Sequence, residues 1–497
     1  MSYAQRLVKG SLWIFAMYFA SGIISTILRI FLARNLTIEE FGMFYAVLSV
    51  SGFLLIFKDL GLSQTMTKFI AEFNAEKDRK GVKSVIYSAL AMQFLLAFFM
   101  TSAVFLAAPT LAQFYFKNAG AEEPLRLIML SYLFSVFVSL QYALQGLGKI
   151  ELYSVIEPLR NILTLVAAVF LIHMGAVGVA QSYLAGTIII SVIIFLFVLK
   201  SFPFFSVAAG IERAMASRLW HFSAPLFVAN IGGVALNYFD TILITAMLSL
   251  GSVALYQVAL PTSQIIWALM GSASIVILPI ISELWARKDS AMIRKMLGLI
   301  VKFYFVFSIP FIIPVVAFPE IIIRMLFGEQ YLGAAAALQI LVINSVFYAV
   351  FWILSTAMIA VGEPKTNRNI VLLLGATNVF LNLALIPVLG IEGAALAALL
   401  SYIIGASLMI RHLAAKSLIT IHAHDIVKSM FGGAISFAAM LFIKSFLDMN
   451  AWIEAAAAVL CGAAIYALFL FATKTVKKEE LAVLKKGGIP IPSAFLR

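Results

Sequence analysis

The sequence predicts an all-α integral membrane protein with about fourteen transmembrane helices. Three observations support this fold class: the mean hydropathy is +1.05, only 12% of the residues are charged, and 63% are hydrophobic. Apolar segments of about 20 residues recur along the whole chain. A water-soluble fold could not bury that much apolar surface, so lipid is the solvent for most of the chain. The single cysteine, Cys461, excludes a disulfide framework and a cysteine-based metal site.

The predicted spans are separated by short polar links. They cover residues 10–33, 41–62, 84–108, 125–146, 156–174, 177–200, 221–248, 253–282, 298–319, 335–360, 370–388, 391–411, 429–447 and 452–473. The first apolar stretch, about 24 residues or roughly 36 Å of helix, is too long for the core of a signal peptide. No small-residue cleavage site follows it, so we expect a first membrane helix that is retained.

The distribution of lysine and arginine predicts the orientation. Of the 35 basic residues, Arg29 and Lys58 are assigned to spans. The links on the outer side hold Arg34, Lys117, Arg126, Arg324 and Lys444. All the others, Arg160 and Lys302 included, are counted with the links on the N-terminal side of the membrane. This asymmetry predicts a multi-pass protein of the cell membrane with both termini in the cytoplasm. The net charge of +12 is then a fringe near anionic head groups and needs no nucleic acid to explain it.

The chain repeats itself at a spacing of about 207 to 219 residues. Four short motifs recur in the same order: Leu-Trp-x-Phe from Leu12 and Leu219, Arg-Asn-Ile from Arg160 and Arg368, a glycine turn from Gly175 and Gly390, and Tyr-x-x-Gly from Tyr183 and Tyr402. Repeats of six helices share one topology and are related by an axis along the membrane normal. We therefore predict lobes at 1–205 and 206–425 around a central cleft, followed by a helix pair and basic cytoplasmic tail at 426–497. Lobes that rock about such a cleft favour a transporter.

Several motifs resemble a known family. The stretches Ala33–Tyr45, Lys58–Gln64 and Leu326–Leu341, and the Gly-Glu-Pro-Lys turn at Gly362, are similar to the polysaccharide-biosynthesis (O-antigen-type) flippases. These belong to the multidrug, oligosaccharidyl-lipid and polysaccharide exporter superfamily. The resemblance implies a polyprenyl-diphosphate-linked oligosaccharide as substrate, moved from the cytoplasmic to the outer leaflet by alternating access.

The same resemblance implies the partners of the chain. They are the lipid-linked oligosaccharide, membrane lipids and, as candidates, polysaccharide-assembly enzymes. No cofactor is expected, although Na⁺ or H⁺ is a candidate coupling ion. The glycan and the energy source are not readable from the sequence.

Arg29 is the first candidate binding residue. It lies about one turn from the outer end of the first predicted helix, where an uncompensated charge costs several kcal/mol. Ser25 and Gly22, at i−4 and i−7, share its face. Arg29 either snorkels to the outer head groups or faces the cleft and binds diphosphate oxygens, for which its guanidinium is suited. We expect the second role.

Asp240 is the counterpart of Arg29 in the seventh predicted helix, with Asn237 one turn before it. Three roles remain open for Asp240: an ion pair with Arg29 that closes an outer gate, a coupling site for Na⁺ or H⁺, or a hydrogen-bonded structural acid. Arg29, Ser25, Asn237 and Asp240 form the predicted substrate-binding set.

Lys58 and Asp59 end the second predicted helix, just before Gly61. A lysine near a helix C-terminus complements the helix dipole, but an aspartate there gains nothing from it and needs another partner. We predict that the pair forms a gate at the cytoplasmic mouth, although a structural role explains the residues as well.

Three other classes of protein compete with a flippase. A drug–cation antiporter of the same superfamily commonly has a carboxylate in the first helix, where this chain has Arg29. A membrane glycosyltransferase, polymerase or ligase usually has a large outer loop, and the longest outer link here is short, about 109–124. The sequence shows no nucleophile–base set, no metal-ligand spacing and no P-loop for a nucleotide-driven pump. We therefore expect no enzymatic activity.

Overall fold

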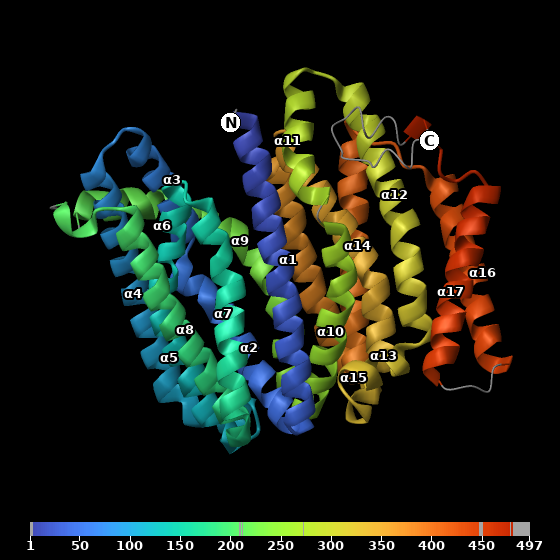
Figure 1. The fold of residues 1–497 in the computed structure, drawn as a ribbon, viewed down its shortest axis with the longest axis horizontal. Helices are drawn as coiled ribbons and strands as arrows, with labels where there is room; N and C mark the ends of the chain where they lie inside the picture. Colours follow the sequence, from blue (N-terminus) through green and yellow to red (C-terminus); the bar gives the residue numbers. More distant parts are fainter. Residues whose placement is uncertain are drawn as a thin grey trace. The chain divides into compact units, whose positions relative to one another are not determined.

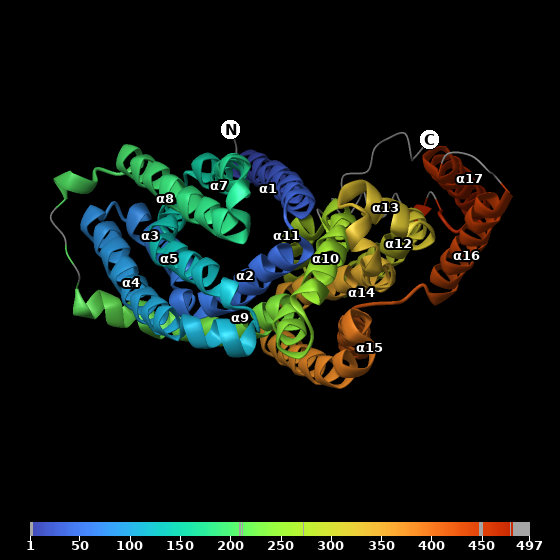
Figure 2. The same ribbon diagram turned by 90° about the horizontal axis from the view of Figure 1, so that it is seen from below.

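The computed structural model describes residues 3–207, 210, 212–271, 273–446, 451–477 and 479–480. Every regular element in these ranges is helical (Figures 1 and 2). The chain divides into two compact units, Met1–Ala254 and Leu255–Arg497.

The described residues of the first unit form nine complete α-helices and the first residues of a tenth. The nine are α1 (Tyr3–Asn35), α2 (Ile38–Asp59), α3 (Leu62–Ala75), α4 (Arg79–Thr110), α5 (Glu122–Val138), α6 (Leu140–Gly146), α7 (Ile150–Leu171), α8 (Gly175–Ser201) and α9 (Arg213–Met247). Helix α7 packs between α1 and α8, and α5 packs between α4 and α8. Helix α9 packs against α2, α3 and α4, so the seventh predicted span lies with the N-terminal helices (Figure 2). The predicted lobe boundary at 205 stays a prediction.

The second unit begins within α10 (Leu250–Gly271). It continues through α11 (Ala273–Ala286), α12 (Ser290–Ala317), α13 (Pro319–Leu326), α14 (Ala335–Ala360), α15 (Pro364–Ala415), α16 (Ala423–Phe446) and α17 (Ala451–Ala472). Helix α14 packs along α15, α12 packs against α14 and α16, and α16 lies beside α17 (Figure 1).

The helices confirm the predicted fold class. Ten apolar segments of the described chain are long enough to cross a membrane. Two of them, Ile150–Ser201 and Pro364–Ala415, each hold two of the predicted spans joined at a glycine turn. The chain is therefore a multi-pass, all-helical membrane protein.

The two glycine turns have the same backbone conformation. Gly175, between α7 and α8, has φ 63° and ψ −143°. Gly390, inside α15, has φ 63° and ψ −136°. Only glycine adopts this region readily. Three residues later, Gly178 lies against the carbonyl of Leu171, and Gly393 lies in the same way against that of Leu385. The sequence repeat therefore corresponds to a repeated turn, in which one glycine supplies the dihedral angles and the next allows close packing.

The sequence did not predict α3. Four residues of its apolar face, Leu62, Met66, Phe69 and Ile70, are fully or almost fully buried in the core of the first unit. This helix is separated from α2 by Leu60 (φ 44°) and Gly61 (φ 78°), whose left-handed dihedral angles end α2. Its 3.6-residue apolar period lies in a polar stretch, so a search for long apolar runs does not detect it.

Candidate functional site

Lys58 is held at the end of α5. Its side chain is 5% exposed, and its Nζ donates to the Ser135 carbonyl at 3.2 Å and to the Ser135 hydroxyl at 2.8 Å. The amide of Ser139 donates to the Val136 carbonyl, as happens where a helix tightens at its end. The Ser135 carbonyl therefore needs another donor, and the Lys58 ammonium supplies both that donor and a positive charge at the helix C-terminus.

Asp59 is held at the start of α3. Its Oδ1 accepts from the Ser63 amide at 3.2 Å, from the Ser63 hydroxyl, and from the buried Gln93 amide nitrogen of α4 at 3.0 Å. The carboxylate gains nothing at the C-terminus of α2, but it is favourable at the N-terminus of α3. The two charges at this position thus stabilise two different helix ends. This geometry supports the structural role, and the predicted gate stays a prediction.

Arg29 lies against α2. Its guanidinium carbon is 4.3 Å from the centre of the Tyr45 ring, a cation–π contact. Arg29 is six residues before the end of α1 and Tyr45 is seven after the start of α2, so both lie about 10 Å from the turn that joins these helices. The Arg29 side chain therefore lies beside α2 at its own level and does not extend along the helix toward that turn. This placement supports a binding role over a snorkelling one.

The face of α1 that carries Arg29 is open within the first unit. Ser25 is exposed, and a Cβ atom added to Gly22 would meet no heavy atom within 4 Å. The packed face of α1 lies elsewhere on the helix: Ser21, Leu28 and Leu32 are buried, and Ser21 accepts a 2.9 Å hydrogen bond from Asn161 of α7. The predicted polar face is thus accessible, as a binding surface must be.

Asp240 and Asn237 differ in exposure. Asp240 is 6% exposed, whereas Asn237 is exposed and donates to the Gly233 carbonyl of its own helix at 2.8 Å. Nearby, Tyr115 and Lys117 donate to the α9 carbonyls of Ile242 and Ala246. Both Asp240 and Arg29 lie in the first unit. The proposed Arg29–Asp240 pair stays a prediction.

Arg160 is the charged residue that the sequence reasoning missed. The count of basic residues placed it in a link, but it lies ten residues inside α7, about 15 Å from the helix start and near the middle of a ~30 Å hydrocarbon layer. Its Nη2 contacts Glu157 at 2.6 Å, and 40% of its side chain is exposed. The signal was available: Glu157 and Arg160 are one turn apart in a predicted span.

Arg160 lies on a helix that packs against both α1 and α8. A guanidinium has five N–H donors, and Glu157 engages one of its nitrogens. Arg160 can therefore bind a second oxyanion in a fork geometry while the Glu157 pair persists.

Arg29, Lys58 and Arg160 thus lie in segments of the first unit that are long and apolar enough to cross a membrane. Two acids of this unit are engaged: Asp59 stabilises α3, and Glu157 pairs with Arg160. Intramembrane charges of this kind mark substrate or ion pathways because they are costly to keep. Two guanidinium groups on α1 and α7, helices that pack together, can recognise an anionic, oxygen-rich group.

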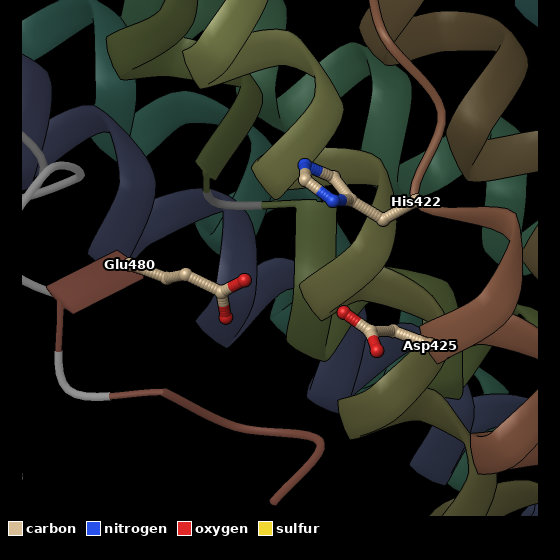
Figure 3. A group of neighbouring side chains, drawn as sticks. All are labelled: His422, Asp425 and Glu480. Carbon is tan, nitrogen blue, oxygen red and sulfur yellow. The ribbon is translucent and has the colours of Figure 1, made fainter.

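A second charged cluster lies in the other unit, where Lys302 of α12 is completely buried. This residue too was counted with a link, and it lies twelve residues inside α12. Its Nζ lies 2.5 Å from Asp425 of α16 and 2.7 Å from Glu480 beyond α17. Figure 3 shows these carboxylates and His422 turned toward a common centre. The Lys302 ammonium lies between the carboxylates, so the cluster is an ion-pair network that holds the tail, not a vacant metal site.

The fold and the intramembrane cations define a class, the multi-span helical transporters. The structure is similar to that of the lipid II flippase MurJ in its inward closed conformation, with a TM-score of 0.79 and 17% identity over 94% of this chain and all of that one. It is also similar to an inward-facing multidrug resistance MATE family transporter, with a TM-score of 0.65 and 14% identity over 80% of this chain and 95% of that one. The chain therefore has the fold of these two transporters.

Comparison with protein families then places the chain. The model of the polysaccharide biosynthesis protein family matches residues 7–285, more than half of the sequence, and the chain belongs to this family. The MatE model matches residues 225–388. Members of this family are membrane transporters and not enzymes.

The chain is similar in sequence to several archaeal membrane proteins. An uncharacterized membrane protein of Methanocaldococcus jannaschii is 29% identical over 81% of this chain and 83% of its own length. The probable flippase AglR of Haloferax volcanii is 28% identical over 69% of this chain and 71% of its own length. The probable low-salt glycan biosynthesis flippase Agl15 of the same organism is 21% identical over 88% of this chain.

Proposed function

We propose that this protein is a flippase that moves a polyprenyl-diphosphate-linked oligosaccharide from the cytoplasmic to the outer leaflet. The observation that carries the proposal is the presence of two arginines, Arg29 and Arg160, at membrane depth on the packed helices α1 and α7. A diphosphate is the part of such a substrate that a guanidinium recognises best. Family membership and the flippases among the relatives support the same substrate class.

In this proposal Arg160 and Arg29 have different roles. Arg160 lies about 15 Å from the start of α7, and Arg29 lies about 10 Å from the outer end of α1. A diphosphate that enters from the cytoplasmic side meets Arg160 first and Arg29 nearer the outer side. The open face of Ser25 and Gly22 beside Arg29 leaves room for sugar hydroxyls. Two cationic positions at successive depths lower the barrier that a diphosphate meets in lipid.

The proposal includes the orientation. We infer that both termini lie in the cytoplasm, because the inner links remain strongly basic after Arg160 and Lys302 are moved into helices. Single cysteines introduced at Glu76 and Glu123, with Cys461 changed to serine, test it with a membrane-impermeant maleimide. Glu123→Cys should react in intact cells and Glu76→Cys only after permeabilisation. The reverse pattern would invert the direction of transport that we propose.

Transport is tested with a fluorescent polyprenyl-diphosphate oligosaccharide in proteoliposomes. Charge-assisted hydrogen bonds contribute about 1.5–3 kcal/mol each, so Arg29→Ala and Arg160→Ala should each lower the apparent affinity by about tenfold or more. Arg287→Ala is the matched control, because Arg287 forms an exposed pair with Glu283 and is 70% exposed. It should transport like the natural chain.

Equal transport by the natural chain, Arg29→Ala and Arg160→Ala would show that neither arginine binds substrate. If no lipid-linked glycan moves through any of these proteins, the proposal fails and cation export through Asp240 becomes the function to assay.

A further inference from the structure

We propose that an apolar pocket in the first unit is the binding site for one hydrocarbon chain of an anionic membrane lipid, distinct from the transported substrate. The pocket has a volume of about 430 Å³ and lies between α4, α5 and α8. This volume is within the range of pockets that hold organic ligands. The inference needs only that these helices cross the membrane, so it is independent of the proposed transport.

The lining is apolar except for two hydroxyl-bearing residues, Tyr87 of α4 and Ser191 of α8. Leu90 of α4, Phe134 and Phe137 of α5 and Phe195 of α8 are apolar. The one hydroxyl among the α8 residues is that of Ser191, which donates to the Thr187 carbonyl at 2.6 Å. Water in such a pocket would lose hydrogen bonds, so a hydrocarbon is the ligand that the lining favours.

The pocket has the length of one leaflet. Along α8 its lining runs from Val198, three residues before the helix ends, back to Ile188. Ten residues of helix rise about 15 Å, half of a ~30 Å hydrocarbon core. Three lining residues are substantially exposed and apolar, Ile188 (36%), Val192 (55%) and Phe137 (42%), so the mouth faces the bilayer. A lipid chain can therefore enter from the side.

The end of the pocket near the helix terminus is closed by aromatic rings. Phe204 lies 5.4 Å from Tyr87 and 6.3 Å from Phe195, measured between ring centres. The buried Lys83 fixes this wall: its Nζ donates to the Val207 carbonyl at 2.6 Å and lies 5.0 Å from the centre of the Phe204 ring. A chain in the pocket is thus shielded from water at the level of the head groups.

A cation marks the head-group level beside the pocket. Lys200 is exposed and lies in the last turn of α8, two residues beyond Val198. A lysine at this position attracts an anionic head group. The basic residue and the apolar pocket together fit an anionic lipid of the leaflet in which α4 begins and α8 ends.

The substrate itself is a poorer occupant. On α5, Ser135 contacts Lys58, whereas Phe134 lines the pocket, about 100° around the same helix. The polar groups near Lys58 and the pocket therefore lie on different sides of α5. A lipid whose diphosphate is bound near Arg160 would have to pass around that helix to place its tail in the pocket.

The experiment uses the full-length protein in phosphatidylcholine vesicles that contain a minor fraction of phosphatidylglycerol with a photoactivatable acyl chain. Labelled peptides should come mainly from the pocket lining of α4, α5 and α8. Ser191→Phe places a ring in the pocket and should reduce this labelling about tenfold, the loss expected when about two methylenes are no longer buried. Leu196→Phe adds the same ring to the same helix at a residue that is 56% exposed and does not line the pocket, and should change nothing.

Further outcomes decide against the proposal. Equal labelling in all three proteins would show ordinary contact with the bilayer. Displacement of the label by a polyprenyl diphosphate, but not by excess phosphatidylglycerol, would make the substrate tail the occupant and overturn our assignment. Should Ser191→Phe unfold, Val192→Trp at the mouth gives the same test. Because labelling does not depend on flipping, these results are separate from those of the transport assay.

Discussion

Lys58 and Asp59 show why the chain places opposite charges side by side in a hydrophobic segment. The ammonium stabilises the C-terminus of α5 and the carboxylate stabilises the N-terminus of α3. The positive charge of Lys58 lies at the partly negative C-terminus of α5, and the negative charge of Asp59 lies at the partly positive N-terminus of α3. The two residues therefore hold the break between α2 and α3 against neighbouring helices.

Replacing Lys58 by methionine keeps the apolar stem and removes the ammonium. The partly buried Ser135 carbonyl then lacks its donor, which should destabilise the protein by about 1–3 kcal/mol. Thermal unfolding in detergent measures this loss, and a double-mutant cycle with Ser135→Ala isolates the hydroxyl contact. If Lys58→Met is as stable as the natural chain but transports poorly, Lys58 is a gate and the structural role is wrong.

Glu363, in the link before α15, is expected to make stability depend on pH. Hydrogen bonds from Lys416 and Thr366 hold the pKa of its carboxyl below its usual value. Because the pKa of the Glu363 carboxyl is lower in the folded protein than the value of about 4.3 in the unfolded chain, this group stabilises the fold above about pH 4.3. That stabilisation is lost as the pH falls through the pKa of the folded protein. Below about pH 4.3, Lys416→Met should therefore show a shallower loss of melting temperature than the natural chain.

The control for Lys416→Met is a substitution of Lys365, an exposed lysine near Glu363. Lys365→Met changes the net charge by the same amount without touching the pair. Its melting temperature should follow the pH dependence of the natural chain. A control that flattens the curve as much as Lys416→Met would assign the effect to net charge.

Among the helices and turns, the motifs that suggested the family have identifiable structural roles. Thr37 and Glu40 form a reciprocal capping box at the start of α2. Gly42 allows the backbone of Leu250 to approach, and a Cβ at Gly61 would lie 2.9 Å from the Ser223 carbonyl of α9. These residues fix helix starts, breaks and close approaches. They identify the fold, and Tyr45, at the end of the first of these motifs, contacts Arg29.

The repeated glycine turns lead to a prediction for both units. Gly175→Ala and Gly390→Ala each force an L-residue into a region that costs about 1–3 kcal/mol, so each should lower the melting temperature. Gly251→Ala is the control, because its Cβ would make only ordinary contacts at 3.7 Å. It should stay within about 0.5 kcal/mol of the natural chain. If Gly175→Ala and Gly390→Ala lowered the melting temperature by different amounts, the two turns would not contribute equally to stability.

The sequence was sufficient for the membrane helices and insufficient for the site. Long apolar runs define spans because lipid allows no other solution, and even the turn at Gly390 was readable as a link. The amphipathic α3 was missed because its period lies in polar sequence. Arg160 was missed because a charge near the edge of a predicted span was assigned to a link, although Glu157 one turn earlier is its partner. Contacts such as Lys58 to Ser135, 77 residues apart, depend on tertiary packing and have no local signal.

For the molecule as a whole, the remaining question is what drives transport. The diphosphate of the proposed substrate is anionic, and the cell interior is negative, so the outward movement that we propose is favoured by the membrane potential. Each uncompensated elementary charge that crosses contributes about 2.3 kcal/mol per 100 mV. If Arg29 and Arg160 neutralise the bound diphosphate, the loaded step carries no net charge and does not depend on voltage. The return of the empty site then carries the positive charge of the two arginines inward, and the same inside-negative potential favours that movement.

We therefore predict that an inside-negative potential accelerates net outward flipping severalfold. A potassium gradient with valinomycin sets the potential in proteoliposomes, and dissipating it is the control. Because about 2.3 kcal/mol corresponds to roughly fiftyfold in an equilibrium, a severalfold change in rate is well within the available energy. Arg160→Ala should lower the rate at every potential and, by leaving substrate charge uncompensated, move the voltage dependence to the loaded step. A rate that ignores the potential but follows a Na⁺ or H⁺ gradient would show that a coupling ion, and not the charge of the diphosphate, drives the cycle.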